Sequence, residues 1–176
     1  MEITERIVES YCRYVKHWFT LPNVRCPGQY EIDLLAIDTS GKRLQRYHVE
    51  CGVSVSGGFS KLTAKPFSLN RLRTRLTQAG ARRTFGYFLE RKFGVSEVLG
   101  TLELYGFRPG NYEKVIVSWG WISEAADLAA QHQITLWDFR SIVREIAETF
   151  GPQRSYFTDD TLRTIHLFNK ALKETR

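Results

Sequence analysis

The alternation of apolar and polar positions in residues 28–55 predicts two neighbouring β-strands. Apolar side chains recur with a period of two in GQYEIDLLAID and in LQRYHVECGVSV, and the turn DTSGKR joins these runs. Two such runs around a short Gly-containing turn are typical of a hairpin. The first strand is apolar on both faces, which indicates burial within a sheet. On the second strand, one face carries Tyr47, Val49, Cys51, Val53 and Val55, and the other carries His48, Glu50, Gly52 and Ser54.

An apolar residue at every third or fourth position predicts helices in other parts of the chain. These helices are expected over residues 4–20, 69–79, 84–93, 95–106, 123–131 and 139–150, and after Thr158. Short apolar runs at 114–119 and 134–137 predict strands, each followed by one of the helices. Strand–helix–strand–helix at this spacing implies a right-handed parallel unit. The predicted fold class is α/β, with a mixed central sheet made from the hairpin and the parallel unit and flanked by helices.

The length and composition favour one folded domain. A chain of 176 residues buries enough surface to fold without a disulfide or a metal. We expect residues 1–176 to form a single domain, with a basic helical insertion at about 56–112. Cys12, Cys26 and Cys51 form no CxxC motif, and the sequence shows neither a signal peptide nor an apolar run long enough for a bilayer. The expected location is a reducing cytoplasm.

Positive charge is concentrated in residues 61–92. The whole chain has a net charge of +6, whereas this segment holds nine cations against Glu90 alone, a net charge of +8. The cations are Lys61, Lys65, Arg71, Arg73, Arg75, Arg82, Arg83, Arg91 and Lys92. A basic block in an otherwise slightly acidic chain is typical of a protein that binds a polyanion. The alternative is a solvated helix face without a partner.

Asp33 and Glu50 are the strongest candidates for chemistry. Each lies in a hydrophobic strand, where a carboxylate is costly unless it binds something. Two carboxylates that converge from a hairpin suit Mg²⁺, which takes one or two carboxylates together with waters and phosphates. Such an ion polarises a phosphodiester and lowers the pKa of an attacking water. The alternative is a pair of surface acids near the turn.

The order of these elements resembles the PD-(D/E)xK restriction-endonuclease-like superfamily. A helix, a strand containing EID, a hairpin and a strand with a buried Glu are followed by strand–helix–strand–helix. The segment SEAADLAAQHQITLWDFRSIVREI is similar to the C-terminal part of the Mrr-like and RecB-like nucleases, where an Ala-rich helix leads to a short strand and a closing helix. The resemblance covers residues 4–55 and 113–150, and it implies a restriction-endonuclease-like core.

The resemblance also implies roles for individual residues. Asp33 matches the family's metal-binding Asp, Glu50 matches its Asp or Glu, and the backbone carbonyl of Cys51 matches the position that often completes the metal shell. ExxVxxYC in the first helix is similar to the family's ExxAxxyL, so Glu5 is the candidate for the helix acid and Glu9 its competitor. The expected cofactor is Mg²⁺ or Mn²⁺.

The sequence departs from the family pattern at Gly52. The family has a Lys two residues after the Glu, which orients the attacking water and offsets negative charge in the transition state. A long side chain from elsewhere can enter the space that glycine leaves. Lys61, after the SGGFS loop, is the nearest candidate, followed by Lys65. His48 shares a face with Glu50 and either assists as a base or is a satisfied strand histidine.

Two functions are consistent with these features. The first is a Mg²⁺-dependent endonuclease or exonuclease that hydrolyses DNA phosphodiester bonds with Asp33, Glu50 and Lys61 as catalytic residues. The second is a catalytically inactive nuclease-fold module that binds nucleic acid or a partner protein. In both, the expected nucleic-acid contacts are Lys61, Lys65, Arg71, Arg73, Arg75, Arg82 and Arg83. The sequence leaves open the choice between DNA and RNA, and whether a homodimer or a larger complex forms.

Overall fold

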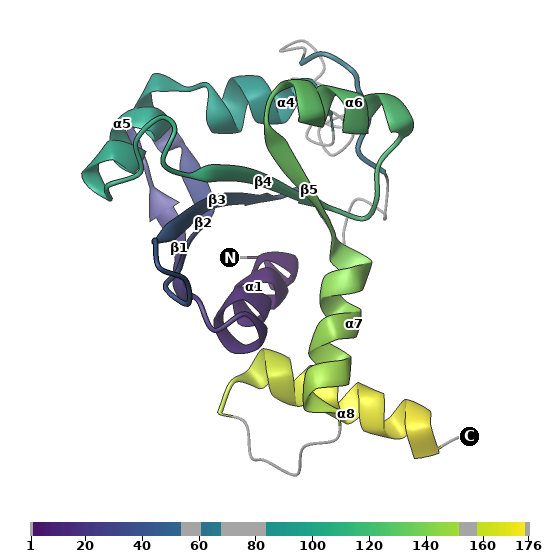
Figure 1. Ribbon diagram of the computed structural model, residues 1–176. Helices are drawn as coiled ribbons and strands as arrows, with labels where there is room; N and C mark the ends of the chain where they lie inside the picture. Colours follow the sequence, from purple (N-terminus) through teal and green to yellow (C-terminus); the bar gives the residue numbers. More distant parts are fainter. Residues whose placement is uncertain (1, 54–60, 68–83, 152–157, 175–176) are drawn as a thin grey trace.

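The computed structural model describes residues 2–53, 61–67, 84–151 and 158–174, and a five-stranded sheet forms its centre (Figure 1). The strands are β1 (Phe19–Arg25), β2 (Glu31–Asp38), β3 (Gln45–Cys51), β4 (Glu113–Ser118) and β5 (Ile134–Asp138), in that order across the sheet. The first three strands pair antiparallel, and β3, β4 and β5 pair parallel. The structure therefore confirms the α/β class, the hairpin and the parallel strand–helix–strand–helix unit.

Helices cover both sides of this sheet. They are α1 (Ile3–Ser10), η1 (Tyr11–Val15), η2 (Pro27–Gln29), α4 (Phe85–Tyr87), η4 (Phe88–Phe93), α5 (Ser96–Leu104), α6 (Ser123–Gln131), α7 (Phe139–Phe150) and α8 (Asp160–Glu174). In Figure 1, α1, α7 and α8 lie on one side of the sheet, and α4, α5 and α6 lie on the other. The helix predicted over residues 69–79 lies outside the described residues.

The prediction of one helix over residues 4–20 is wrong at its C-terminal end. Helix α1 ends at Ser10, the π-helical turn η1 continues it to Val15, and the chain then forms strand β1. Phe19 pairs with Ile37 of β2, so its apolar side chain belongs to a strand although its spacing fits the helix. Pro22 has no N–H to donate, and β1 accommodates it because this strand lies at the edge of the sheet.

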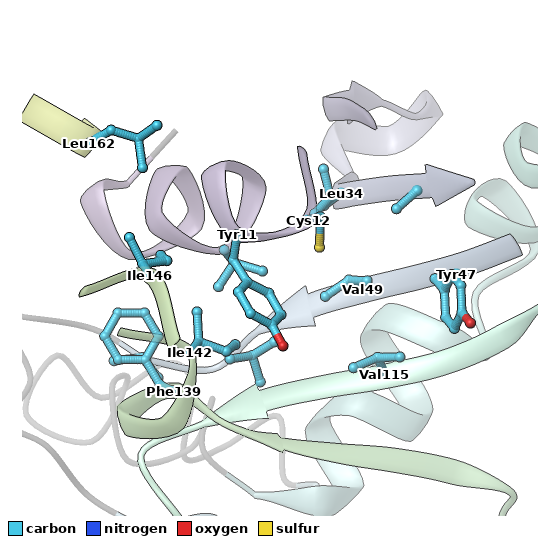
Figure 2. Close-up of a cluster of buried hydrophobic side chains, with 14 of the residues drawn as sticks. Tyr11, Cys12, Leu34, Tyr47, Val49, Val115, Phe139, Ile142, Ile146 and Leu162 are labelled. Carbon is cyan, nitrogen blue, oxygen red and sulfur yellow. The ribbon is translucent and has the colours of Figure 1, made fainter. Parts of the chain in front are cut away.

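An apolar core fills the side of the sheet that faces α1 and α7 (Figure 2). Side chains from the sheet, from η1 and from α7 meet there, and all are nearly inaccessible to water. The labelled members are Tyr11, Cys12, Leu34, Tyr47, Val49, Val115, Phe139, Ile142, Ile146 and Leu162. Cys51 packs against this cluster, as expected for a residue on the apolar face of its strand. Burial of this apolar surface is the main stabilisation of the fold.

The opposite side of the sheet is covered by the segment that connects β3 to β4. Phe85, Phe88 and Phe93 from α4 and η4 are buried against it. Residues 61–67 are tied to this layer through backbone hydrogen bonds, since Leu62 N donates to Gly120 O at 2.8 Å and Phe85 N donates to Thr63 O at 2.8 Å. This layer supplies the part of the candidate site that the hairpin lacks.

Two further predictions concern the cysteines and membrane-spanning helices. Cys12, Cys26 and Cys51 are all free thiols. Among the residues that the structure describes, none of the helices combines the length and the apolar character needed to cross a membrane.

Candidate functional site

Asp33 and Glu50 lie side by side on β2 and β3, the two strands of the antiparallel hairpin. The β2–β3 register pairs Leu34 with Val49, and its continuation by one residue sets Asp33 opposite Glu50. Directly opposite residues of an antiparallel pair point to the same face of the sheet. This face is the one covered by η4, and the Glu50 side chain is 0% exposed there. The two carboxylates predicted from the sequence therefore meet in a buried site.

The ammonium group of Lys92 lies between these two carboxylates. Its Nζ atom donates to Asp33 Oδ1 at 2.8 Å and to the backbone carbonyl of Glu31 at 3.0 Å. The same atom forms an ion pair with Glu50 Oε2 at 2.6 Å. Two of the three N–H donors of this ammonium are therefore used by Glu31 and Asp33, whereas the contact with Glu50 Oε2 is an ion pair without hydrogen-bond geometry. Lys92 belongs to η4, so the site joins the hairpin to the segment that crosses over it.

The remaining oxygen of each carboxylate is also held. The backbone N–H of Cys51 donates to Asp33 Oδ2 at 2.8 Å. His48 Nε2 lies 2.7 Å from Glu50 Oε1, and both side chains are completely buried. Hydrogen bonds of this kind fix the rotamers of both acids, so the two carboxylates are oriented before any ligand arrives.

Burial and mutual repulsion perturb the two acids strongly. Burial, followed by the negative charge of Glu50, raises the pKa of Asp33 to about 7 against the opposing effect of Lys92. Burial also raises the pKa of Glu50. Burial alone would lower the pKa of Lys92, but the Glu50 and Asp33 carboxylates outweigh it and raise that pKa. Two carboxylates against one ammonium leave one excess negative charge, which favours the uptake of a proton or a further cation.

His48 is a neutral positioning residue in this arrangement. Burial and the positive charge of Lys92 lower its pKa to about 3, so the ring is uncharged at neutral pH. Since a carboxylate only accepts hydrogen bonds, Nε2 carries the proton that binds Glu50. The ring packs edge-on against Phe93, with centroids 4.9 Å apart. Among the described residues, Nδ1 of His48 has no hydrogen-bond partner.

The space beside Gly52 is filled by Phe88. A Cβ atom at Gly52 would come within 2.8 Å of the end of the Phe88 ring, and Phe88 is itself 2% exposed. A lysine at position 52 therefore has no room while Phe88 stays in place. Phe88 and Lys92 are four residues apart on η4, so the turn that closes over Gly52 also delivers the ammonium.

This arrangement corrects the prediction that Lys61 supplies the ammonium. Lys61 is exposed and lies beside Gly120 and Arg140, and no described contact links it to Asp33 or Glu50. Lys65 is exposed as well. The other predicted nucleic-acid contacts lie outside the described residues; they are Arg71, Arg73, Arg75, Arg82 and Arg83. Sequence reasoning placed Lys92 only in the basic segment.

The first helix brings Glu5, rather than Glu9, towards the site. Burial and the negative charge of Asp33 raise the pKa of Glu5. Glu9 instead accepts a hydrogen bond from the Thr20 hydroxyl at 3.3 Å, on the side of strand β1. Thr4 fixes the start of α1 over the end of β3, because its hydroxyl donates to Val53 O at 2.8 Å. Glu5 therefore interacts with Asp33 through charge, and no described contact joins it directly to Asp33 or Glu50.

The oxygens around Lys92 fit a hard divalent cation. An ammonium already lies within 3.0 Å of three oxygens, which shows that one cation can contact both carboxylates at once. Each carboxylate oxygen keeps a further lone pair beyond its present partner. Within the described residues no group of three or more His, Cys, Asp or Glu forms a metal-binding cluster. Mg²⁺ needs only one or two carboxylates when waters and substrate phosphates complete its shell.

Comparison with known proteins does not assign a family. No protein-family model and no curated protein matches this chain. The crystal structure of AF1548, a protein of unknown function, covers 98% of this chain and 94% of its own, with a TM-score of 0.47 and 15% sequence identity. Likeness at this level to a protein of unknown function identifies neither a family nor an activity. The functional argument therefore rests on the site itself.

Proposed function

We propose that the protein is a metal-dependent nuclease that hydrolyses phosphodiester bonds of DNA. The single observation that carries the proposal is the buried set of Asp33, Glu50 and Lys92. The carboxylates of these two acids lie 2.8 and 2.6 Å from the lysine ammonium, and such a set offers ligands for a metal and a positive charge for the transition state of phosphodiester hydrolysis. The resemblance to the PD-(D/E)xK superfamily supports the same reading, with Lys92 in place of the motif lysine that Gly52 lacks.

Each residue has a separate task in the proposed reaction. Asp33 and Glu50 would hold Mg²⁺ or Mn²⁺, and such an ion supplies polarisation of the phosphodiester and a lower pKa for the attacking water. Lys92 moves its ammonium towards the scissile phosphate, where it offsets the negative charge of the transition state. His48 keeps Glu50 oriented, and the N–H of Cys51 does the same for Asp33. Glu5 of α1 adds negative charge near Asp33.

Cleavage of mixed DNA and RNA substrates in the presence of Mn²⁺ tests this proposal. We expect the wild type to cleave. Lys92→Met should lose cleavage by about 100-fold or more, the usual effect of removing one transition-state donor, and Asp33→Asn should lose cleavage because it removes a ligand of the metal. Lys42→Met is the matched control, because Lys42 is an exposed lysine of the β2–β3 turn. A wild type that cleaves no nucleic acid with Mg²⁺ or Mn²⁺ would refute the enzyme.

The alternative is a nuclease fold that binds nucleic acid or a partner protein without cleaving it. The ion pair of Lys92 with both carboxylates favours this alternative in one respect, since an internal cation already occupies the gap. Binding that persists in EDTA and falls steeply with salt, with no cleavage under any metal, would identify it. We place either activity in a reducing cytoplasm, where Cys12, Cys26 and Cys51 remain thiols.

A further inference from the structure

An arginine and two aromatic rings lie directly beside the candidate site. Arg91 precedes Lys92 in the chain, and Tyr30 precedes Glu31, whose carbonyl accepts from Lys92. Consecutive Cα atoms are about 3.8 Å apart, so Arg91 and Tyr30 are immediate neighbours of the carboxylate–lysine set. No task in the proposed reaction uses either of them.

The Arg91 guanidinium contacts both rings through their faces. Its Cζ atom lies 4.8 Å from the centroid of Tyr30 and 6.0 Å from the centroid of Phe67. All three side chains are half-buried, so each keeps a surface that faces solvent. Among the described residues no carboxylate forms an ion pair with Arg91, and its N–H donors are free for an anion. A planar cation of this type stacks on rings and binds phosphate equally well.

Phe67 is held in place by the backbone around it. Gly86 N donates to Lys65 O at 3.2 Å, and a Cβ atom at Gly86 would collide with the backbone of Pro66 and Phe67. The ring of Phe67 also contacts Tyr87, with centroids 5.9 Å apart. The aromatic surface is therefore fixed by α4 rather than carried on a free loop.

The sequence segment that contains Phe67 and Arg91 is strongly basic, as expected for a protein that binds nucleic acid. Phe67 and Arg91 both belong to residues 61–92, which carry nine cations and one acid. A basic path with aromatic faces is the combination that binds single strands, because every unpaired base can stack on a ring. In a duplex the bases are already stacked and paired, so their faces are not available to Tyr30 or Phe67.

We propose that Tyr30, Phe67 and Arg91 form a stacking site for an unpaired base next to Asp33 and Glu50, so that the substrate carries a single-stranded segment. This inference rests on the proposed nuclease function and specifies its substrate class. The base stacks on the ring faces of Tyr30 and Phe67 that the Arg91 guanidinium leaves uncovered, while Arg91 contacts the adjoining phosphate. The scissile phosphate then lies within one or two nucleotides of the stacked base.

Binding in EDTA tests this site without any cleavage. The measurement is fluorescence anisotropy with a labelled single strand of about 12 nucleotides, a length within the usual site size, and with a duplex of the same sequence. We expect the wild type to prefer the single strand. Tyr30→Leu and Phe67→Leu should each weaken single-strand binding by roughly 5- to 100-fold and leave duplex binding nearly unchanged. Tyr105→Leu, at the exposed tyrosine that follows the last residue of α5, is the matched control.

Each outcome separates this inference from the proposed activity. Equal loss on single strand and duplex, no loss in either variant, or no binding of the single strand by the wild type would overturn the stacking site. Arg91→Lys keeps the charge and removes the planar stack, so its loss on the single strand should exceed its loss on the duplex even if Tyr30→Leu fails to fold. Selective single-strand binding without cleavage by Mn²⁺ would refute the nuclease and leave the stacking site standing.

Discussion

The two faces of strand β3 differ in what they bury. Tyr47, Val49 and Cys51 point into an apolar core with α1 and α7, where shape and volume determine the stability. His48 and Glu50 point to the other side, where both are 0% exposed and where each buried polar atom left without a hydrogen-bond partner costs stability. Adjacent residues of β3 therefore lie in two different environments, one apolar and one with buried charges.

The comparison shows why the charged face needs a second element to complete it. The apolar face is stabilised by the burial of each of its methyl groups, whichever part of the chain supplies it. The face with Asp33 and Glu50 loses stability on burial unless a cation arrives in the right place. That cation is Lys92, which comes from the crossover between β3 and β4. The apolar core with α1 and α7 and the buried charges of the candidate site thus lie on opposite faces of β3.

Removal of the cation should have the largest effect on the charged face. Lys92→Met leaves Asp33 and Glu50 buried without a partner, so we expect a loss of about 3–5 kcal/mol in the free energy of unfolding at pH 8. The loss should shrink at pH 5, because protonated acids need no counter-ion. Urea unfolding at both pH values measures this. An equal loss at the two pH values would place the effect in packing instead of charge.

Removal of apolar volume should have a similar or smaller effect on the opposite face. Ile146 is 0% exposed in the core of Figure 2, and Ile146→Ala should cost about 2–5 kcal/mol. Because no ionisable partner is lost, the cost should be the same at pH 5 and pH 8. A marked pH dependence in this variant would show that charge also contributes to the stability of the apolar face.

A methyl group at Gly52 should have an intermediate effect. The added Cβ would meet the buried Phe88 ring at 2.8 Å, and overpacking of this kind costs about 1–3 kcal/mol. Gly52→Ala should therefore lower the thermal midpoint, and the double variant with Phe88→Leu should recover part of the loss relative to Phe88→Leu alone. Additive losses in the double variant would show that the two positions do not press on each other.

The stability of the wild type should itself depend on pH through Asp33. The pKa of Asp33 is raised from 3.8 to about 7 in the folded state, so the folded protein binds more protons than the unfolded chain between these values. Stability is then greatest below about pH 4 as far as this group is concerned, and it falls as the pH rises towards 7. Asp33→Asn should flatten this part of the stability profile measured by urea unfolding. An unchanged profile would assign the titration to another group.

The sequence predicts the hairpin half of the site and fails on the other half for a physical reason. Asp33 and Glu50 follow from a period of two, which fixes the face of each side chain without reference to the rest of the molecule. Lys92 reaches them only through the docking of η4, which depends on contacts between distant residues such as Phe88 and Gly52. The sequence shows that Gly52 stands where the family pattern has a lysine, but it does not show which other lysine lies near the two acids.

Strand β1 shows the same limit at the level of secondary structure. The apolar residues from Ile3 to Phe19 continue one helical spacing, and nothing local marks the change to a strand after Val15. The pairing of Phe19 with Ile37 decides the outcome, and this partner lies in a separate part of the chain. The predicted bounds of α6 and α7 agree with the structure because their apolar faces are local signals, and the Asp138 side chain caps α7 by accepting a hydrogen bond from Arg140 N.

The contact between Gly52 and Phe88 also constrains the history open to this site. A lysine introduced at position 52 collides with the Phe88 ring, and loss of Lys92 before that leaves two buried acids without a counter-ion. The two lysine placements therefore exclude each other as long as Phe88 is present. A lineage that exchanges one for the other must first replace Phe88 with a smaller residue and tolerate a cavity. The route between the two forms passes through a weaker protein, which is a barrier that selection on activity alone would not reveal.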